Sequence, residues 1–148
     1  MEYRQLTADH IPEVADFFVQ AFSAPPWSEQ WTIETASKRL QAMMSHSGAY
    51  GLIAYQGAQA VGAILGYEEA YYNGPRFEIK EFWTSQACQG QGIGSELLVQ
   101  LEQRLQQRGI CQVVLLTARG ERTEGFYQHR GYRLCEDQIW MLKQLETC

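Results

Sequence analysis

The chain is short of cations and has no long apolar run. Its 148 residues contain 12 Lys and Arg against 17 Asp and Glu, a net charge of −5. Nucleic-acid binders hold phosphates with clustered cations, so we expect no nucleic-acid partner. No stretch reaches the roughly 18 apolar residues that span a membrane, and the opening MEYRQLTADH lacks the basic and apolar regions of a signal peptide. We therefore predict a cytoplasmic protein with no membrane partner.

The cysteines also lack a pattern. Cys88, Cys111, Cys135 and Cys148 form no CxxC pair, and no His stands at zinc-ligand spacing from them. Free thiols in a reducing compartment and no metal site are therefore expected.

The chain shows no internal repeat, no low-complexity tract and no linker rich in Pro, Gly or Ser. Its length is close to the commonest size of a single domain, and 45% of its residues are hydrophobic. One globular domain over residues 1–148 is the prediction.

Apolar periodicity and turn residues predict the order of the elements. The expected helices cover residues 11–22, 33–44, 95–108 and 123–130, and the expected strands cover 3–6, 50–55, 60–67, 76–84, 113–116, 132–135 and 139–142. The apolar run at 113–116 is typical of a strand buried on both faces. This order predicts an α/β (α+β) fold with a mixed, mostly antiparallel sheet, one βαβ crossover and helices on both faces.

A glycine-rich loop, QGQGIG at 89–94, stands between a strand and a helix. Glycines let the backbone take positive φ and approach a ligand closely, and the first amides of a helix attract anions. The loop therefore suits a phosphate or pyrophosphate. A P-loop would need a Gly-Lys pair, which the chain lacks, and a dinucleotide fingerprint would need glycine at Ser95. A glycine turn without a ligand is the alternative.

At this loop the chain resembles a known family. Gln-x-x-Gly-x-Gly opening a leucine-faced helix is similar to the acyl-CoA pyrophosphate loop of the GNAT superfamily of N-acetyltransferases. Phe126-Tyr127 with Gly131-Tyr132 is similar to that family's F-Y-x-x-x-G-F/Y segment, and the predicted element order agrees with its fold. The resemblance implies an enzyme that moves an acetyl group from acetyl-CoA to a primary amine by direct attack in a ternary complex. Similar proteins often form homodimers.

The resemblance also implies where acetyl-CoA binds. Backbone groups of Phe82, Trp83 and Thr84 would contact the thioester carbonyl and the pantetheine arm. The pyrophosphate would lie on the amides of the loop and the helix start, namely Gln89, Gly90, Gln91, Gly92, Ile93, Gly94 and Ser95. Ser95 could instead simply begin the helix.

Glu81 is the candidate base, because an alkylamine is mostly ammonium at neutral pH and must lose a proton. Strand alternation places Glu81 on one face with Ile79 and Trp83, where partial burial would raise its pKa. Glu78, on the opposite face, is the second candidate, and water alone is a third option. The structural alternative for Glu81 is a surface carboxylate or one paired with Lys80 or Arg76.

Tyr127 is the candidate general acid for the departing thiolate. A phenol can donate a proton at neutral pH, and the resemblance places this tyrosine beside the thioester. The alternative is a core aromatic residue of a short amphipathic helix.

The acceptor is expected to be a small cationic amine held by aromatic side chains. Trp27 and Trp31 lie between the first two helices, and Tyr71 precedes a turn. Core packing is the alternative for the two tryptophans, and an exposed turn for Tyr71. Three other functions stay open: acetylation of a protein amine, a non-catalytic acyl-CoA-binding or regulatory module, and a nucleotide-binding domain.

Overall fold

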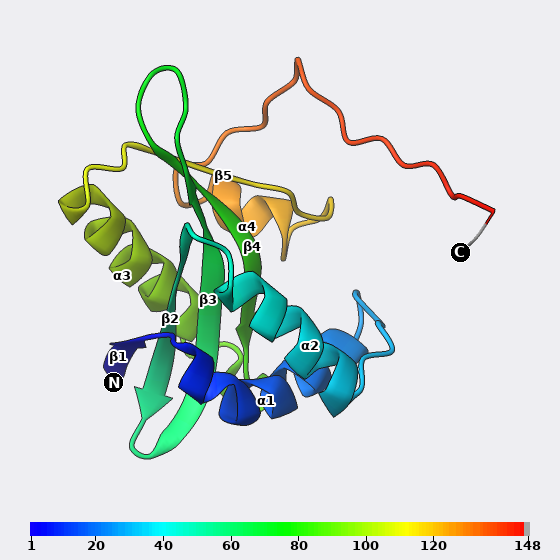
Figure 1. The fold of residues 1–148 in the computed structure, drawn as a ribbon. Helices are drawn as coiled ribbons and strands as arrows, with labels where there is room; N and C mark the ends of the chain where they lie inside the picture. Colours follow the sequence, from blue (N-terminus) through cyan, green and yellow to red (C-terminus); the bar gives the residue numbers. More distant parts are fainter. Residues whose placement is uncertain (147–148) are drawn as a thin grey trace. The chain divides into compact units, whose positions relative to one another are not determined.

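The computed structural model describes residues 1–146, which fall into two compact units, 1–115 and 116–146. The first unit contains a five-stranded sheet and three α-helices, and the second contains one short helix (Figure 1). In chain order the elements are β1 (Glu2–Gln5), η1 (Ala8–His10), α1 (Ile11–Ser23), α2 (Ile33–Met44), β2 (Ala49–Gln56), β3 (Gln59–Glu69), β4 (Arg76–Thr84), η2 (Gln86–Cys88), α3 (Ile93–Gln107), β5 (Gln112–Leu115) and α4 (Glu124–Gln128). None of the helices in this part of the chain has the length and apolar character needed to cross a membrane.

The sheet confirms the predicted fold class. Its strand order is β1-β2-β3-β4-β5, with every neighbouring pair antiparallel except β4 and β5. Those two strands are parallel and are joined through α3, which forms the predicted βαβ crossover. The parallel pairing covers only the first part of β4, from Arg76 to Ile79, and residues 80–84 continue alongside β3 alone.

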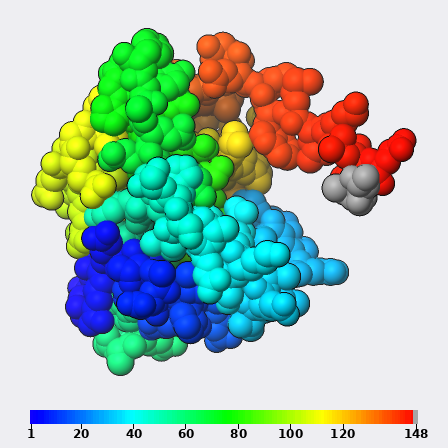
Figure 2. Space-filling model, viewed as in Figure 1, coloured from blue at the N-terminus to red at the C-terminus, as the bar shows by residue number. Residues whose placement is uncertain are grey.

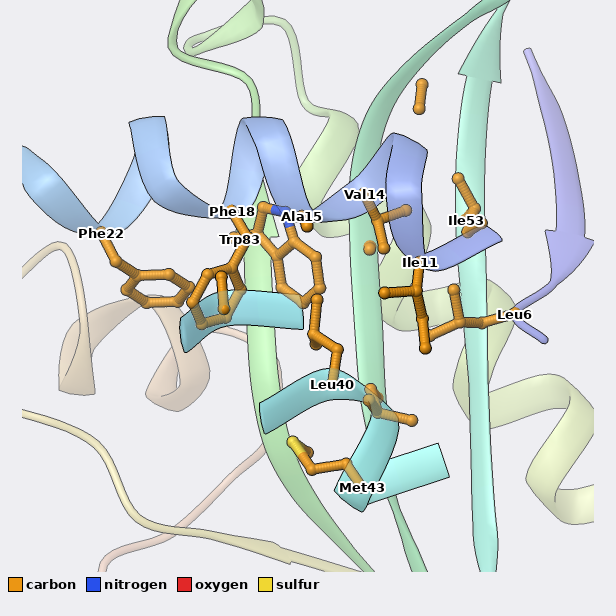
Figure 3. Close-up of a cluster of buried hydrophobic side chains, with 14 of the residues drawn as sticks. Leu6, Ile11, Val14, Ala15, Phe18, Phe22, Leu40, Met43, Ile53 and Trp83 are labelled. Carbon is orange, nitrogen blue, oxygen red and sulfur yellow. The ribbon is translucent and has the colours of Figure 1, made fainter. Parts of the chain in front are cut away.

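Helices cover both faces of this sheet. The buried cluster on one face joins α1 and α2 to Leu65 of β3 and Trp83 of β4. Figure 3 shows Trp83 lying below α1 beside Phe18, with Leu40 of α2 pointing towards it; the Phe18 and Trp83 ring centroids are 5.1 Å apart, edge to face. On the other face, Leu97 and Ile93 of α3 approach Gly62 of β3.

A β-bulge in β4 changes the predicted facing of its side chains. Glu81 pairs with Leu65, whereas Ile79 pairs with Gly66, so Lys80 is an extra residue in β4. Directly opposed residues share a face, and neighbours along a strand lie on opposite faces. Ile79 and Glu81 are therefore on opposite faces, and the prediction that they share one is wrong.

The same register brings the two candidate carboxylates to one face. Glu78 pairs with Tyr67, and Tyr67 lies two residues from Leu65, the partner of Glu81. Glu78 and Glu81 thus both face the side that α1 and α2 cover, although simple alternation places them on opposite faces. The bulge also depends on close approach, because a Cβ at Gly66 would lie 2.0 Å from the carbonyl oxygen of Glu78.

Three other predictions about strands are wrong. Residues 132–135 and 139–142 contain no strand, and the side chains of Ile139 and Met141 are each 81% exposed. A strand needs a hydrogen-bonded neighbour, and these segments pair with none among residues 1–146. The strand predicted at 113–116 is β5, which is half-buried and not buried on both faces; it is an edge strand that pairs with β4 alone in the described sheet.

Figure 2 views the face of the first unit that α1 and α2 form. The turn between β3 and β4 projects from this unit as a separate loop (Figures 1 and 2).

Candidate active site

Glu81 forms an ion pair across the α2 face of the sheet. Its carboxylate is only 12% exposed and meets the guanidinium of Arg39 from α2. The Arg39 Nε donates to Oε1 of Glu81 at 2.7 Å, and Nη2 lies 2.6 Å from the same oxygen. The alternative of an ion-paired carboxylate is thus what the structure shows, but with Arg39 as the partner and not Lys80 or Arg76.

Two opposing effects act on the pKa of Glu81. Burial raises its pKa above the ordinary value of 4.5, while the charge and hydrogen bond of Arg39 lower it by a smaller amount. The net result is a raised pKa, as expected from a carboxylate removed from water. A carboxylate in this state is a stronger base than one on the surface.

Tyr67 and Glu78 lie close to this pair. Burial raises the pKa of Tyr67, the charge of Arg39 lowers it, and the carboxylates of Glu78 and Glu81 raise it further. Lys80 lies over the Tyr67 ring at 6.0 Å and 3.7 Å from the carboxylate of Glu78. Two acids and two bases are therefore grouped around one tyrosine.

The placement of Arg39 follows from how α2 begins and packs. Thr32 caps the helix by accepting a hydrogen bond from the Thr35 amide at 3.0 Å, as its residue type predicts. Ala36 and Met43 are buried, and Arg39 lies between them at helical spacing. Sequence reasoning missed Arg39, although this position on the edge of a buried stripe was a usable signal.

Trp31 supports Arg39 from the segment before α2. Its ring centroid lies 5.8 Å from the guanidinium carbon of Arg39, and its Nε1 donates to Glu29 at 2.8 Å. The ring also meets Phe18 edge to face at 5.3 Å. Trp31 is thus partly a core residue and partly a wall of the Glu81 site.

The other two predicted acceptor residues have different neighbours. Trp27 packs against Phe22, with ring centroids 5.9 Å apart. Tyr71 lies in the projecting turn and stacks on Arg76, whose guanidinium carbon is 3.9 Å from the ring centroid. Of the three aromatic residues, Trp31 is the one linked to Glu81 through Arg39.

The glycine-rich loop leads into α3 through two residues with positive φ. Gly90 and Gly92 have φ of +83° and +77°, and a Cβ built on either meets nothing within 4 Å. The helix α3 begins at Ile93, no side chain caps it, and the amide of Glu96 donates to the Gly92 carbonyl at 3.1 Å. The amides of Ile93 and Gly94 therefore precede the first intrahelical bond, whereas the amides of Gln89 and Gln91 donate to the carbonyls of Gln86 and Cys88, at 3.2 and 3.4 Å.

The predicted pantetheine strand lies where the pairing of β4 with β5 has ended. Phe82, Trp83 and Thr84 pair with β3 beyond Ile79, the last residue that pairs with β5. The Trp83 side chain is buried in the core, so only its backbone is available for the expected role.

Tyr127 belongs to α4 in the second unit, whereas Glu81 belongs to the first. Its ring contacts those of Phe126 and Tyr132, at centroid distances of 5.1 and 5.5 Å. Burial raises the pKa of Tyr127 to about 12. The phenol therefore keeps its proton at neutral pH, which a general acid requires.

Three of the four cysteines are described, and Cys88, Cys111 and Cys135 are free thiols. Cys148 lies outside the described residues. Within residues 1–146 no three His, Cys, Asp or Glu side chains are grouped as metal ligands.

Comparison with known proteins points to one family. A profile described as the Acetyltransferase (GNAT) family matches residues 13–132 and so crosses the boundary between the two units. No curated protein matches the sequence.

Solved structures share the fold at low identity. A possible acetyltransferase from Clostridium difficile 630 gives a TM-score of 0.82 at 13% identity, over 98% of each chain. An aminoglycoside acetyltransferase from an uncultured soil metagenomic sample, in complex with sisomicin, gives 0.77 at 18% identity, over 98% of this chain and 96% of that one. A ribosomal-protein-alanine N-acetyltransferase from Brucella melitensis biovar Abortus 2308 gives 0.78 at 15% identity, over 97% and 100%.

The pair of Arg39 and Glu81 predicts a pH-dependent loss of stability in Arg39→Gln. Near pH 4, below the ordinary pKa of 4.5, Glu81 is mostly protonated in both the folded and the unfolded chain, so Arg39 contributes little charge attraction. As the pH rises through the raised pKa of Glu81, the folded chain must hold a desolvated carboxylate, and Arg39 offsets that cost. We expect the variant to lose about 1–2 kcal/mol at pH 8, less than a fully buried pair would because Arg39 is 38% exposed.

Urea unfolding at pH 4 and pH 8 measures this difference. Lys38→Gln, on the exposed side of α2, removes the same charge and should change stability by less than about 0.5 kcal/mol at both pH values. A loss in Arg39→Gln that is equal at the two pH values would contradict the prediction.

Proposed function

The chain belongs to the GNAT family of acetyltransferases, and from that premise we propose that it transfers an acetyl group from acetyl-CoA to a primary amine. The observation that carries the proposal is the desolvated carboxylate of Glu81. It lies on β4 two residues after the pairing with β5 ends. An ordinary surface carboxylate would not have its pKa raised in this way.

Two features support acetyl-CoA as the acyl donor. The open space around Gly90 and Gly92 at the uncapped start of α3 suits a pyrophosphate, which backbone amides can bind without cationic side chains. The β4 segment Phe82–Thr84, beyond the reach of β5, offers a strand beside which a pantetheine arm can lie. The net charge of −5 is compatible with this arrangement, because the binding groups are local dipoles.

The reaction assigns one proton transfer to each candidate residue. Acetyl-CoA supplies a thioester carbonyl that an amine nitrogen can attack directly in a ternary complex. Glu81, directly or through water, accepts the proton that turns the bound ammonium into the attacking amine, and the second nitrogen proton passes to water once the carbon–nitrogen bond has formed. Tyr127 donates its phenolic proton to sulfur as the carbon–sulfur bond breaks, and both side chains then exchange protons with water.

The acceptor is proposed to be a small molecule whose reacting amine is cationic in water. The acidic and aromatic surroundings of Glu81, including Trp31 and Tyr67, support this choice. Structural neighbours include acetyltransferases named for an aminoglycoside and for a ribosomal protein, so a protein amine is the alternative. Cytoplasmic location and homodimer formation stay predictions.

Release of CoA thiol from acetyl-CoA, measured across a panel of amines, tests the activity itself. Calorimetric titration with CoA, ATP and NAD accompanies it. Tight binding of CoA without thiol release from any amine would indicate a non-catalytic acyl-CoA-binding module, and binding of ATP or NAD in place of CoA would indicate a nucleotide-binding domain.

Glu81→Gln is expected to lower kcat by about 100-fold, a typical contribution of a positioned base. In the unchanged protein, kcat should rise with pH through the raised pKa of Glu81, since only the carboxylate accepts a proton. Glu78→Gln is the matched control, because it removes a carboxylate from the same face, and it should change kcat by less than about threefold. A larger loss of kcat in Glu78→Gln than in Glu81→Gln would assign the base to Glu78. Equal kcat in the two variants would favour water alone.

Tyr127→Phe is expected to preserve CoA affinity and to lower kcat at least about tenfold, because the phenolic proton is lost and the ring is kept. Steady-state kinetics and CoA titration measure the two quantities. Tyr72→Phe removes the same hydroxyl from a side chain that is 87% exposed and should leave both unchanged. An unaltered kcat in Tyr127→Phe would remove Tyr127 from this role.

Gly92→Ala should weaken CoA binding by about tenfold, because alanine disfavours φ of +77° and would shift the loop amides. Gly109→Ala provides a control at the other end of α3, where φ is +83° and the built Cβ also meets nothing within 4 Å. Both variants should lose similar stability on heating, and only Gly92→Ala should lose CoA affinity in calorimetry. Equal CoA affinity in the two variants would argue against the loop as the pyrophosphate site.

A further inference from the structure

The ion pair of Glu81 and Arg39 leaves one polar atom of each side chain without a hydrogen bond. Both contacts from Arg39 end on Oε1 of Glu81, through Nε and Nη2. Within residues 1–146, no hydrogen bond uses Oε2 of Glu81 or Nη1 of Arg39. The arginine is 38% exposed and the glutamate 12% exposed. A hydrogen-bond acceptor and a cationic donor therefore lie side by side, each with capacity left.

This arrangement determines which charged groups an acceptor can carry if it is to bind beside the ion pair. A purely cationic amine would meet a carboxylate whose charge is already balanced, and it would lie beside a guanidinium that never loses its proton. The repulsion opposes binding. An acceptor that carries an anion next to its amine places one charge on each partner, and the guanidinium edge matches a carboxylate in shape.

The charges around the pair oppose an acceptor that is only an anion. Lys80 lies 3.7 Å from Glu78 and Arg39 pairs with Glu81, while the charge of Glu29 also raises the pKa of Glu81. These three carboxylates and two cations leave one negative charge. A zwitterion places its anion on Arg39 without adding a net charge to this partly buried site.

Arg39 is held in position before any acceptor binds. Its guanidinium contacts the Trp31 ring at 5.8 Å, and that ring is fixed by a hydrogen bond to Glu29 and by an edge-to-face contact with Phe18. A side chain that is already ordered loses little conformational freedom when it binds a ligand.

We propose that the acceptor is an amino carboxylic acid, whose amine is received by Oε2 of Glu81 and whose carboxylate is received by Nη1 of Arg39. This inference rests on the proposed function and narrows its acceptor from a cationic amine to a zwitterionic one. Arg39 is then the residue that selects the acceptor, and Glu81 is the residue that receives its proton.

The test compares amino acids with their own carboxamides, which differ only in the anion. The readout is the ratio of kcat/KM for acid over amide, measured by thiol release with acetyl-CoA. A carboxamide lowers the pKa of the neighbouring amine and so makes it the easier nucleophile. A preference for the acid therefore cannot come from amine basicity.

We expect the unchanged protein to prefer the acid at least about tenfold, the usual effect of one hydrogen bond to a charged group. Arg39→Gln should reduce the ratio to below about twofold, and Arg39→Lys should restore part of it. The ratio is the informative quantity. Loss of Arg39 also removes the ion-pair partner of Glu81, and this change should alter the rates with the acid and with the amide by the same factor. Lys38→Gln, which removes an exposed charge from the same helix, should keep the full ratio.

Calorimetric titration of the same acids and amides into the CoA-bound protein separates this inference from the proposed function. If no acceptor is acetylated, the proposed function fails; binding of amino acids that Arg39→Gln abolishes would still support the inference, and lack of such binding would overturn it. Equal ratios in the unchanged protein and Arg39→Gln overturn it as well. Acetylation confined to polyamines or peptide N-termini overturns the inference and leaves the proposed function intact.

Discussion

The β-bulge in β4 is the constraint on which the candidate site depends. One extra residue, Lys80, opposite the Leu65–Gly66 step reverses the facing of every side chain that follows. Without it, Glu81 would point to the α3 face and away from α2. The bulge also directly follows Ile79, where the pairing with β5 ends. One local irregularity therefore aims the carboxylate and marks the point at which β4 and β5 no longer pair.

The site formed on that face balances desolvation against pairing. Burial raises the pKa of Glu81, while the charge and the hydrogen bond of Arg39 oppose that rise. The aromatic core below it is rigid, with Phe18 in edge-to-face contact with both Trp31 and Trp83. The burial of Glu81 thus rests on the same packing that joins α1 and α2 to the sheet.

Much of the fold and part of the site could be predicted from the sequence. The long helices, the Thr32 cap and the strands up to residue 84 follow from periodicity and turn residues, which act over a few positions. The glycine-rich loop and the helix that follows it were also predicted from the sequence. The apolar segment 139–142 also has the composition of a strand, yet it forms none, because composition does not supply a neighbouring strand.

By itself, the sequence determined the local elements, the glycine-rich loop before α3 and the chemical groups that the proposed reaction would use. Those features depend on neighbours in the chain. Only the tertiary structure decided that Glu81 faces α2 and that its partner is Arg39, a residue 42 positions away. The reason is physical: a bulge and an ion pair between distant segments depend on strand register and helix packing, and neither is encoded within one short stretch.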